Sequence, residues 1–324
     1  MAVDLRQKSL LTLADFSPEE IRFLIDLARV VKRERQQGSF PRRFEGRTIA
    51  LLFEKRSTRT RCAFETAFGE EGGHPVFLSQ SDIHLGVKET VEDTARVLGR
   101  MFDAIQFRGY KQETVQLFAE HSNKPVYNGL TDLYHPTQIL ADLQTLLEAS
   151  GELEGRTLAF VGDGRNNVAR SLLIGCSKLG VHIRLAAPKS LFPDTETVEV
   201  ARSFAADSGS EVTITDSPGD AVAGADAVYT DVWVSMGEEK QSEQRLRTLA
   251  PYRVNDELLD RTGNPDVIFL HCLPAVRGNE VTSEVMDGPH SRVWDESENR
   301  KHTIKALMLA TLLEADELPL RPPR

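Results

Sequence analysis

Short apolar runs alternate with helical patterns along the first half of the chain. Thr48 to Phe53 has the length and composition typical of a buried strand. Ser17-Pro18-Glu19-Glu20 is typical of a helix start, with a capping serine, an early proline and acids in the first turn. The same reasoning predicts further strands over residues 75–78, 104–107 and 125–127, and helices over residues 59–68, 91–101, 113–120 and 135–147.

The second half repeats this alternation after a polar stretch at residues 148–155. Strands are predicted over residues 157–161, 182–186, 211–214, 227–230 and 267–270, and helices over residues 168–179, 198–207 and about 303–313. A chain of 324 residues exceeds the usual size of a single core. We therefore expect two doubly wound α/β domains, each a mostly parallel sheet flanked by helices.

The charge of the chain limits its partners. The formal net charge is −10, which repels nucleic acid and anionic membranes, so we expect neither as a partner. An anionic substrate would need a local basic site that overrides the average charge. The cysteines, Cys62, Cys176 and Cys272, are odd in number and far apart, which favours free thiols over a disulfide framework or a zinc site.

The sequence also predicts a cytoplasmic location. Free thiols fit a reducing compartment. The first residues lack the apolar core of a signal peptide, and no apolar run approaches the roughly 18 residues of a membrane span.

A cluster of cations and hydroxyls, residues 55–61, directly follows the strand that ends at Phe53. A helix begins inside it, and the first N–H groups and the dipole of a helix favour an anion there. Ser57, Thr58 and Thr60 supply hydroxyls, and Arg59 can hold phosphate oxygens in pairs. The spacing differs from a glycine-rich nucleotide loop. We expect a phosphate site here; the alternative is a solvated basic patch.

Other polar residues follow further predicted strands. Arg108 follows the strand at 104–107, and His135 and Gln138 lie three apart at a helix start, where they can face one way. This pair suits hydrogen bonding to a carbonyl oxygen and an amide. Because ligands of open α/β sheets bind beyond the carboxyl ends of the strands, we expect these residues near the anion site.

Three clusters stand out in the second half. Residues 162–167, Gly-Asp-Gly-Arg-Asn-Asn, resemble a dinucleotide fingerprint, but Asn167 replaces its third glycine and no acid closes the next strand, so a nicotinamide cofactor is not expected. Asp231 follows a strand and can pair with a substrate ammonium, with Ser235 adding a hydrogen bond. Cys272 follows the strand at 267–270; we expect an inert thiol rather than a nucleophile. Arg300 precedes the last predicted helix.

Together these segments resemble the aspartate/ornithine carbamoyltransferase family. Residues 57–61, Ser-Thr-Arg-Thr-Arg, and 135–138, His-Pro-Thr-Gln, are similar to elements shared by its aspartate and ornithine branches. Residues 231–237 and 271–274, His-Cys-Leu-Pro, resemble the ornithine branch, where the aspartate branch would carry Pro-Leu-Pro-Arg at the latter position. The likeness runs from about residue 7 to residue 315, with the motifs in the same order.

The resemblance implies an enzyme of arginine metabolism that moves the carbamoyl group of carbamoyl phosphate to the side-chain amine of L-ornithine, giving L-citrulline and phosphate. It implies a carbamoyl-phosphate-binding domain at residues 1–148, an ornithine-binding domain at 149–300, and a C-terminal helix at 301–324 that packs back on the first domain. It also implies direct amine attack through a tetrahedral intermediate, no cofactor and no metal, and a homotrimer or an assembly of trimers with shared active sites.

The resemblance assigns the site residues as well. Those assigned to carbamoyl phosphate are Ser57, Thr58, Arg59, Thr60, His84, Arg108, His135, Gln138, Cys272, Leu273 and Arg300, with Lys55 adding positive charge nearby. Those assigned to ornithine are Asn167, Asp231, Ser235 and Met236, and the catalytic group is Arg108, His135, Cys272 and Arg300. His84 stands where the family usually has a glutamine donated by a neighbouring subunit, so this position departs from the family's pattern.

Three other functions stay open at this point. The acceptor is another amine, such as putrescine or agmatine, if residues that bind the amino-acid end of ornithine are missing. A catalytically silent phosphate- or amino-acid-binding module is the alternative from a different class, and a nicotinamide dehydrogenase is a weak third. The direction of the pathway, biosynthetic or catabolic, and any allosteric effector are not encoded in these motifs.

Overall fold

The computed structural model describes residues 3–83, 88–234 and 242–320 of the chain. The backbone divides into two compact units, which we call the first unit, residues 1–141 and 298–324, and the second unit, residues 142–297. The divisions fall inside two helices, α5 (Pro136–Ser150) and α12 (Val293–Leu312). The substrate-domain boundaries expected at residues 148 and 300 stay a prediction.

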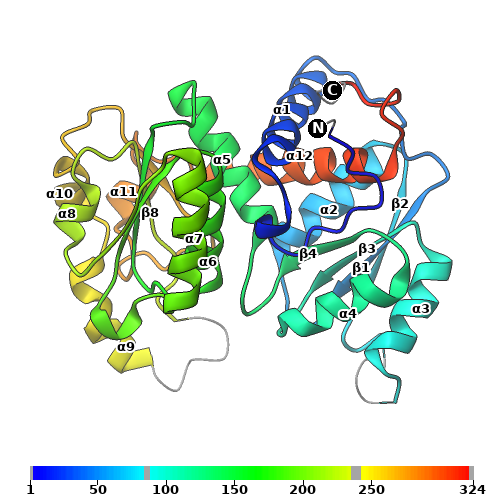
Figure 1. Cartoon of the computed structure of the whole chain (residues 1–324), viewed down its shortest axis with the longest axis horizontal. Coiled ribbons are helices and arrows are strands. Elements are labelled where there is room, and N and C mark those ends of the chain that lie inside the picture. Colours follow the sequence, from blue (N-terminus) through cyan, green and yellow to red (C-terminus); the bar gives the residue numbers. More distant parts are fainter. Residues whose placement is uncertain (1–2, 84–87, 235–241, 321–324) are drawn as a thin grey trace. The chain divides into compact units, whose positions relative to one another are not determined.

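The first unit is built on a parallel sheet with the strand order β2-β1-β3-β4. Its strands are β1 (Thr48–Phe53), β2 (His74–Ser79), β3 (Ala104–Arg108) and β4 (Val126–Leu130), and its helices are α1 (Pro18–Gln36), α2 (Thr58–Glu70), α3 (Val91–Met101) and α4 (Gln112–Ser122). Right-handed crossovers place α2 on one face and α3 with α4 on the other, as Figure 1 shows, with α1 and α12 on the face of α2.

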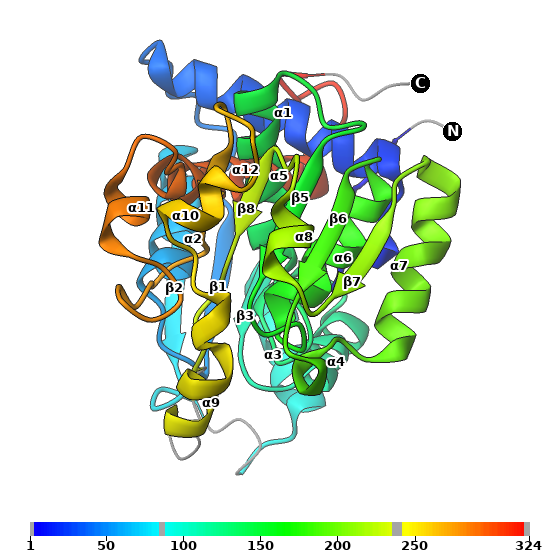
Figure 2. The same cartoon turned by 90° about the vertical axis from the view of Figure 1, so that its left-hand side faces the viewer.

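The second unit has its own parallel sheet, in the order β7-β6-β5-β8-β9; Figure 2 shows β8, β5, β6 and β7 side by side. Its strands are β5 (Thr157–Val161), β6 (His182–Ala186), β7 (Val212–Thr215), β8 (Ala227–Tyr229) and β9 (Ile268–Leu270). Its helices are α6 (Asn167–Lys178), α7 (Thr195–Ser208), α8 (Pro218–Val222), α9 (Ser242–Leu249), α10 (Asp256–Asp260) and α11 (Ser283–Asp287). The predicted two-domain α/β fold, with a C-terminal helix returning to the first unit, is confirmed.

Apolar side chains pack between the first sheet and its helices. Leu52, Ile105 and Phe107 from the strands meet Phe118 of α4 in one buried cluster, where the rings of Phe107 and Phe118 lie 5.6 Å apart. Burying side chains of this size stabilises the fold by about 1.5–3 kcal/mol each. The core thus fixes β1 and β3 as neighbours, with Phe53 opposite Arg108 at their carboxyl ends.

Most predicted elements are found, but the last helix was placed wrongly. α12 begins at Val293 and contains Arg300, whereas the sequence predicted a start near residue 303 with Arg300 ahead of it. The first turns of α12 are polar, yet Glu296 and Arg300 are buried because each meets polar partners. A search for apolar residues at helical spacing does not detect such a segment.

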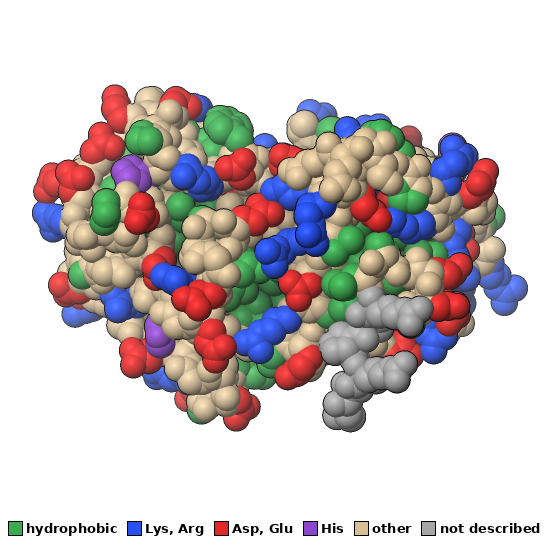
Figure 3. Space-filling view, turned by 90° about the horizontal axis from the view of Figure 1, so that it is seen from above, with side chains coloured by type: hydrophobic (Ala, Val, Ile, Leu, Met, Phe, Trp, Pro, Cys, Tyr) green, Lys and Arg blue, Asp and Glu red, His purple; other side chains and the backbone are tan. Residues whose placement is uncertain are grey.

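The surface carries charges of both signs. Acidic and basic side chains are interspersed over the face drawn in Figure 3. In the part of the chain that the structure describes, the helices are too short or too polar to cross a bilayer.

Each sheet has a point where the chain reverses its winding direction. In the first unit this point lies between β1 and β3, and in the second between β5 and β8. Ligands of open α/β sheets bind beyond the strands at such points. The segments after β1, β3, β5 and β8 are therefore the places to examine for a site.

Candidate active site

The predicted anion site lies at the amino end of α2. Ser57 caps this helix, and its Oγ accepts the N–H of Thr60 at 3.1 Å. Thr58 is exposed, while Arg59 and Lys55 are half-buried beside it. The N–H groups of a helix's first turn and the helix dipole make this end attractive to an anion.

Two arginines from distant segments meet on one hydroxyl behind this helix end. Nη1 of Arg108 and Nη2 of Arg300 each donate to Oγ1 of Thr60 at 3.1 Å. Thr60 is fully buried, and the two arginines are only 7% and 2% exposed. Two guanidinium groups held this closely, at the positive end of a helix, produce the local positive potential that the acidic chain requires.

His135 lies beside this cationic group and is only 3% exposed. Burial lowers the pKa of its imidazole well below 6.5, and the charges of Arg300, Arg108 and Arg59 lower it further. The ring is therefore neutral at physiological pH. A neutral imidazole among cations can donate one hydrogen bond to a carbonyl oxygen without adding a further positive charge.

The residues after His135 extend the group. The N–H of Gln138 donates to the carbonyl of His135 at 3.0 Å, and the Gln138 side chain is 1% exposed. Oγ1 of Thr137 accepts Nη2 of Arg300 at 3.4 Å. The first unit thus brings together the predicted residues of the β1–α2 loop, Arg108, the start of α5 and Arg300.

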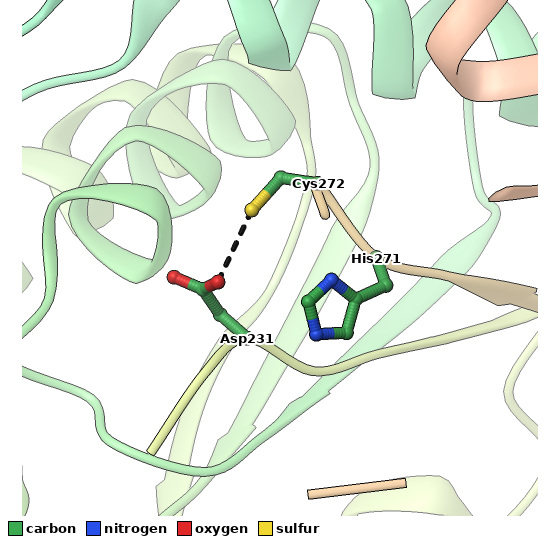
Figure 4. Close-up of side chains that lie close together, drawn as sticks. All are labelled: Asp231, His271 and Cys272. Atoms are coloured by element: carbon green, nitrogen blue, oxygen red, sulfur yellow. Dashed lines mark hydrogen bonds between the residues drawn. The ribbon is translucent and has the colours of Figure 1, made fainter. Parts of the chain in front are cut away.

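In the second unit, Asp231 is the centre of a hydrogen-bond group just beyond β8. Its Oδ1 accepts the N–H of Val232 at 2.8 Å and the thiol of Cys272 at 3.1 Å (Figure 4). Its Oδ2 accepts the side-chain amide of Asn166 at 3.2 Å. Burial raises the pKa of the Asp231 carboxyl above 3.8. A bound ammonium would favour the charged form of this carboxyl, which is what an amine-binding carboxylate requires.

Cys272 behaves as a hydrogen-bond donor. Burial raises the pKa of its thiol well above 9.0, and the neighbouring Asp231 carboxylate raises it further. The thiol therefore keeps its proton at neutral pH, whereas a nucleophilic cysteine needs the thiolate. This environment agrees with the expectation of an inert thiol.

Buried acids that the sequence analysis missed support the loop that carries Cys272. Oε2 of Glu296 accepts the N–H of His271 at 2.9 Å. Nδ1 of His271 accepts the N–H of Leu273 at 2.8 Å, and its Nε2 lies 3.4 Å from a carboxylate oxygen of Glu280. A charged residue inside an apolar helical run, as Asp142 is in Ile-Leu-Ala-Asp-Leu, is the signal that could have pointed to such buried acids.

Side chains around the loop after β5 add two further groups. Asn166 caps α6 through its Oδ1, which accepts the N–H of Ala169 at 2.7 Å, and it also reaches Asp231. Asn167, the predicted ligand, is half-buried in the first turn of α6. Buried Arg245 pairs with Asp163 and donates from Nε to the carbonyl of Trp233 at 2.7 Å. These contacts hold the loop after β5 and the loop after β8 in place.

Three predicted residues, His84, Ser235 and Met236, lie outside the described residues. Among the residues that are described, Asp231, His271 and Cys272 form a group whose potential ligand atoms lie within 4.8 Å of one another, so a metal ion could be held there. Figure 4 shows the Cys272 sulfur directed at Asp231, with which it already shares a hydrogen bond.

Comparison with known proteins decides the family. Residues 8–148 match the family described as aspartate/ornithine carbamoyltransferase, carbamoyl-P binding domain, and residues 154–311 match its Asp/Orn binding domain. The chain belongs to the aspartate/ornithine carbamoyltransferase family. The prediction of a carbamoyl-group transferase of this family is thereby confirmed, and the descriptions of the two domains support carbamoyl phosphate and an amino acid as substrates.

Relatives within the family share the whole length of the chain. The chain is 62% identical to an ornithine carbamoyltransferase of Caldanaerobacter subterraneus subsp. tengcongensis, over 97% of the chain and 100% of the relative. It is 53% identical to a catabolic ornithine carbamoyltransferase of Bacillus licheniformis, over 97% and 99%. The solved ornithine carbamoyltransferase of Pyrococcus furiosus superposes with a TM-score of 0.93 at 43% identity, covering 96% and 98%. These names support carbamoyl transfer to ornithine.

Proposed function

We propose that the protein transfers the carbamoyl group of carbamoyl phosphate to the side-chain amine of L-ornithine, giving L-citrulline and phosphate. The observation that carries the proposal is the meeting of Arg108 and Arg300 on the Thr60 hydroxyl at the amino end of α2. This arrangement suits a phosphate dianion, and the names of the relatives supply the acceptor.

The donor is bound by the first unit in this proposal. Ser57, Thr58, Arg59 and Thr60 hold the phosphate at the amino end of α2, and Lys55 adds positive charge. The neutral imidazole of His135 donates to the carbamoyl oxygen, and Gln138 binds the carbamoyl amide. Arg108 contacts both the phosphate and the carbamoyl group of carbamoyl phosphate.

Ornithine is bound by the second unit. Asp231 pairs with an ammonium of the substrate, and its raised pKa falls when a cation arrives. The rest of the amino-acid end of ornithine is bound by Asn167, Ser235 and Met236. Cys272 donates to Asp231 and, with Leu273, lies near the reacting amine without becoming a nucleophile.

The chemistry is a direct attack. The side-chain amine must first lose a proton, because its free pKa is about 10.4 like that of lysine. Its nitrogen lone pair then forms a bond to the carbamoyl carbon, and the carbonyl electrons move to oxygen. Arg108 and His135 stabilise that oxyanion. The oxyanion collapses and the bond to the phosphate oxygen breaks. The extra proton on the attacking nitrogen passes to the departing phosphate, whose charge is held by Arg59 and Arg300.

Assembly remains part of the proposal. We propose a homotrimer, or an assembly of trimers, in which a neighbouring subunit contributes His84 to the site. A protonatable ring at that position would make donor binding weaken as the pH rises through the imidazole pKa, because the protonated form attracts the dianion. Native mass measurement tests the assembly.

A citrulline-formation assay across L-ornithine, putrescine and agmatine tests the function. We expect product with ornithine alone, because only ornithine offers an α-carboxylate to the amino-acid grip. Product with putrescine at equal efficiency would contradict the acceptor, and absence of product with every amine would contradict the transferase. The Arg59→Ala variant should lose affinity for carbamoyl phosphate.

A further inference from the structure

Glu54 places a carboxylate at the edge of a site built for a dianion. It follows β1 directly and precedes the cationic cluster at residues 55–61. A negative charge there weakens anion binding by simple repulsion. Its presence therefore calls for a physical explanation, and the contacts of its side chain provide one.

The Glu54 residue holds both sides of the turn at Gly109. Its backbone N–H donates to the carbonyl of Arg108 at 2.9 Å, which continues the pairing of β1 and β3 beyond its last ladder pair. Its Oε2 accepts the N–H of Tyr110 at 3.0 Å. The turn that follows Arg108 is thus connected to the end of β1 by one backbone and one side-chain hydrogen bond.

Gly109 is what allows the carboxylate to reach the turn. A Cβ at this position would lie 2.2 Å from Oε2 of Glu54 and 2.2 Å from the ring of Phe107. Any side chain would therefore displace the carboxylate or the buried ring. Glu54 and Gly109 therefore depend on each other, because the absence of a side chain at Gly109 leaves room for the Glu54 carboxylate that accepts the hydrogen bond.

The same turn sets the position of Lys55. Nζ of Lys55 lies 4.5 Å from the centre of the Tyr110 ring, a cation–π contact. Burial lowers the pKa of the Lys55 ammonium, as does the nearby charge of Arg108, while the carboxylates of Asp132 and Glu54 act against both. Lys55 and Arg108, two cations that repel each other, are therefore held together by the turn and by the acids around it.

We infer that Glu54 is a positioning residue for the carbamoyl phosphate site: through its hydrogen bond to Tyr110 it sets the turn that aligns Arg108 and Lys55. The inference rests on the proposed function for the identity of the anion. It requires that Glu54 act as a hydrogen-bond acceptor rather than as a charge. The conservative and the truncating substitutions then have opposite effects.

Three variants separate these roles. Glu54→Gln keeps an oxygen for the Tyr110 N–H but removes the charge, so we expect a KM for carbamoyl phosphate equal to or below that of the wild type. Glu54→Ala removes the acceptor, and we expect that KM to rise about tenfold, which corresponds to about 1.4 kcal/mol. Gly109→Ala displaces the carboxylate and should raise the KM similarly. The KM for ornithine should stay within about twofold in all three.

A double-mutant cycle decides the mechanism. If Glu54 acts through the turn, the effect of Glu54→Ala combined with Gly109→Ala should be smaller than the sum of the two single effects, because both remove the contact of Glu54 with the turn, whereas only Gly109→Ala also displaces the Phe107 ring. Additive effects would overturn the inference, as would a Glu54→Gln variant as impaired as Glu54→Ala. Glu113→Ala, on the exposed surface of α4, controls for unspecific effects. A wild type without citrulline formation would instead refute the proposed function.

Discussion

Replacing Thr60 by valine changes little volume but withdraws one acceptor from two buried guanidinium groups. Arg108 and Arg300 each donate to this hydroxyl at 3.1 Å. A lost hydrogen bond to a charged group costs about 1.5–3 kcal/mol. The carbonyl of Gly129 and the Thr137 hydroxyl, both at 3.4 Å, recover part of that loss. We expect a net decrease of about 2–3 kcal/mol in the free energy of unfolding.

The loss of alignment should also appear in catalysis. With the two arginines no longer held on one atom, we expect the KM for carbamoyl phosphate to rise at least about tenfold and kcat to fall, because Arg108 also stabilises the oxyanion in the proposed mechanism. Steady-state citrulline formation and urea unfolding measure the two effects. Thr60→Ser keeps the hydroxyl and is the matched control. A Thr60→Val enzyme that matches this control in both assays would refute the convergence of the two arginines.

Three further outcomes follow from the same contacts. Asp231→Asn should raise the KM for ornithine about 100-fold, because a buried charge pair with the substrate is lost. Carbamoyl phosphate binding, measured by calorimetry, should be unchanged. Equal losses of affinity for both substrates would contradict the role of Asp231 in ornithine binding. Cys272→Ser should retain activity within about tenfold of the wild type, because serine can still donate to Asp231, and complete inactivation would restore the nucleophile hypothesis. Because the pKa of His135 lies below 6.5 in the folded protein, the unfolded state binds more protons below that pH, so stability should fall there by up to about 1.4 kcal/mol per pH unit. His135→Gln should remove that part of the slope, and an identical slope in urea titrations would contradict a buried neutral ring.

Much of the fold could be predicted because its local signals agree with its packing. β1 and β5 occupy the predicted ranges, since their side chains are apolar and buried. The helix start at Ser17 shows the expected reciprocal hydrogen bonds with Glu20. In such segments composition, capping and burial point to the same structure, so a local pattern is enough.

The site was only partly predictable, for a physical reason. Ser57 and Thr60 lie three positions apart in the sequence, at a helix start, so their chemistry is visible locally. The contact of Arg300 with Thr60 spans 240 positions, and no spacing encodes it. Glu296 and Asn166 serve the site through other residues, Glu296 by holding His271 and Asn166 by meeting Asp231. A sequence pattern does not report such indirect roles.

The divided first unit has a consequence for synthesis on the ribosome. The second unit is one continuous stretch, residues 142–297, so every part of it has been made while the end of the chain is still to come. The first unit also needs residues 298–324, which bring Arg300 to Thr60 and the hydroxyl of Thr311 to that of Tyr127 at 2.6 Å. The group of residues proposed to bind the anion is therefore completed last, and a nascent chain stalled before residue 298 has the whole second unit but lacks part of the first.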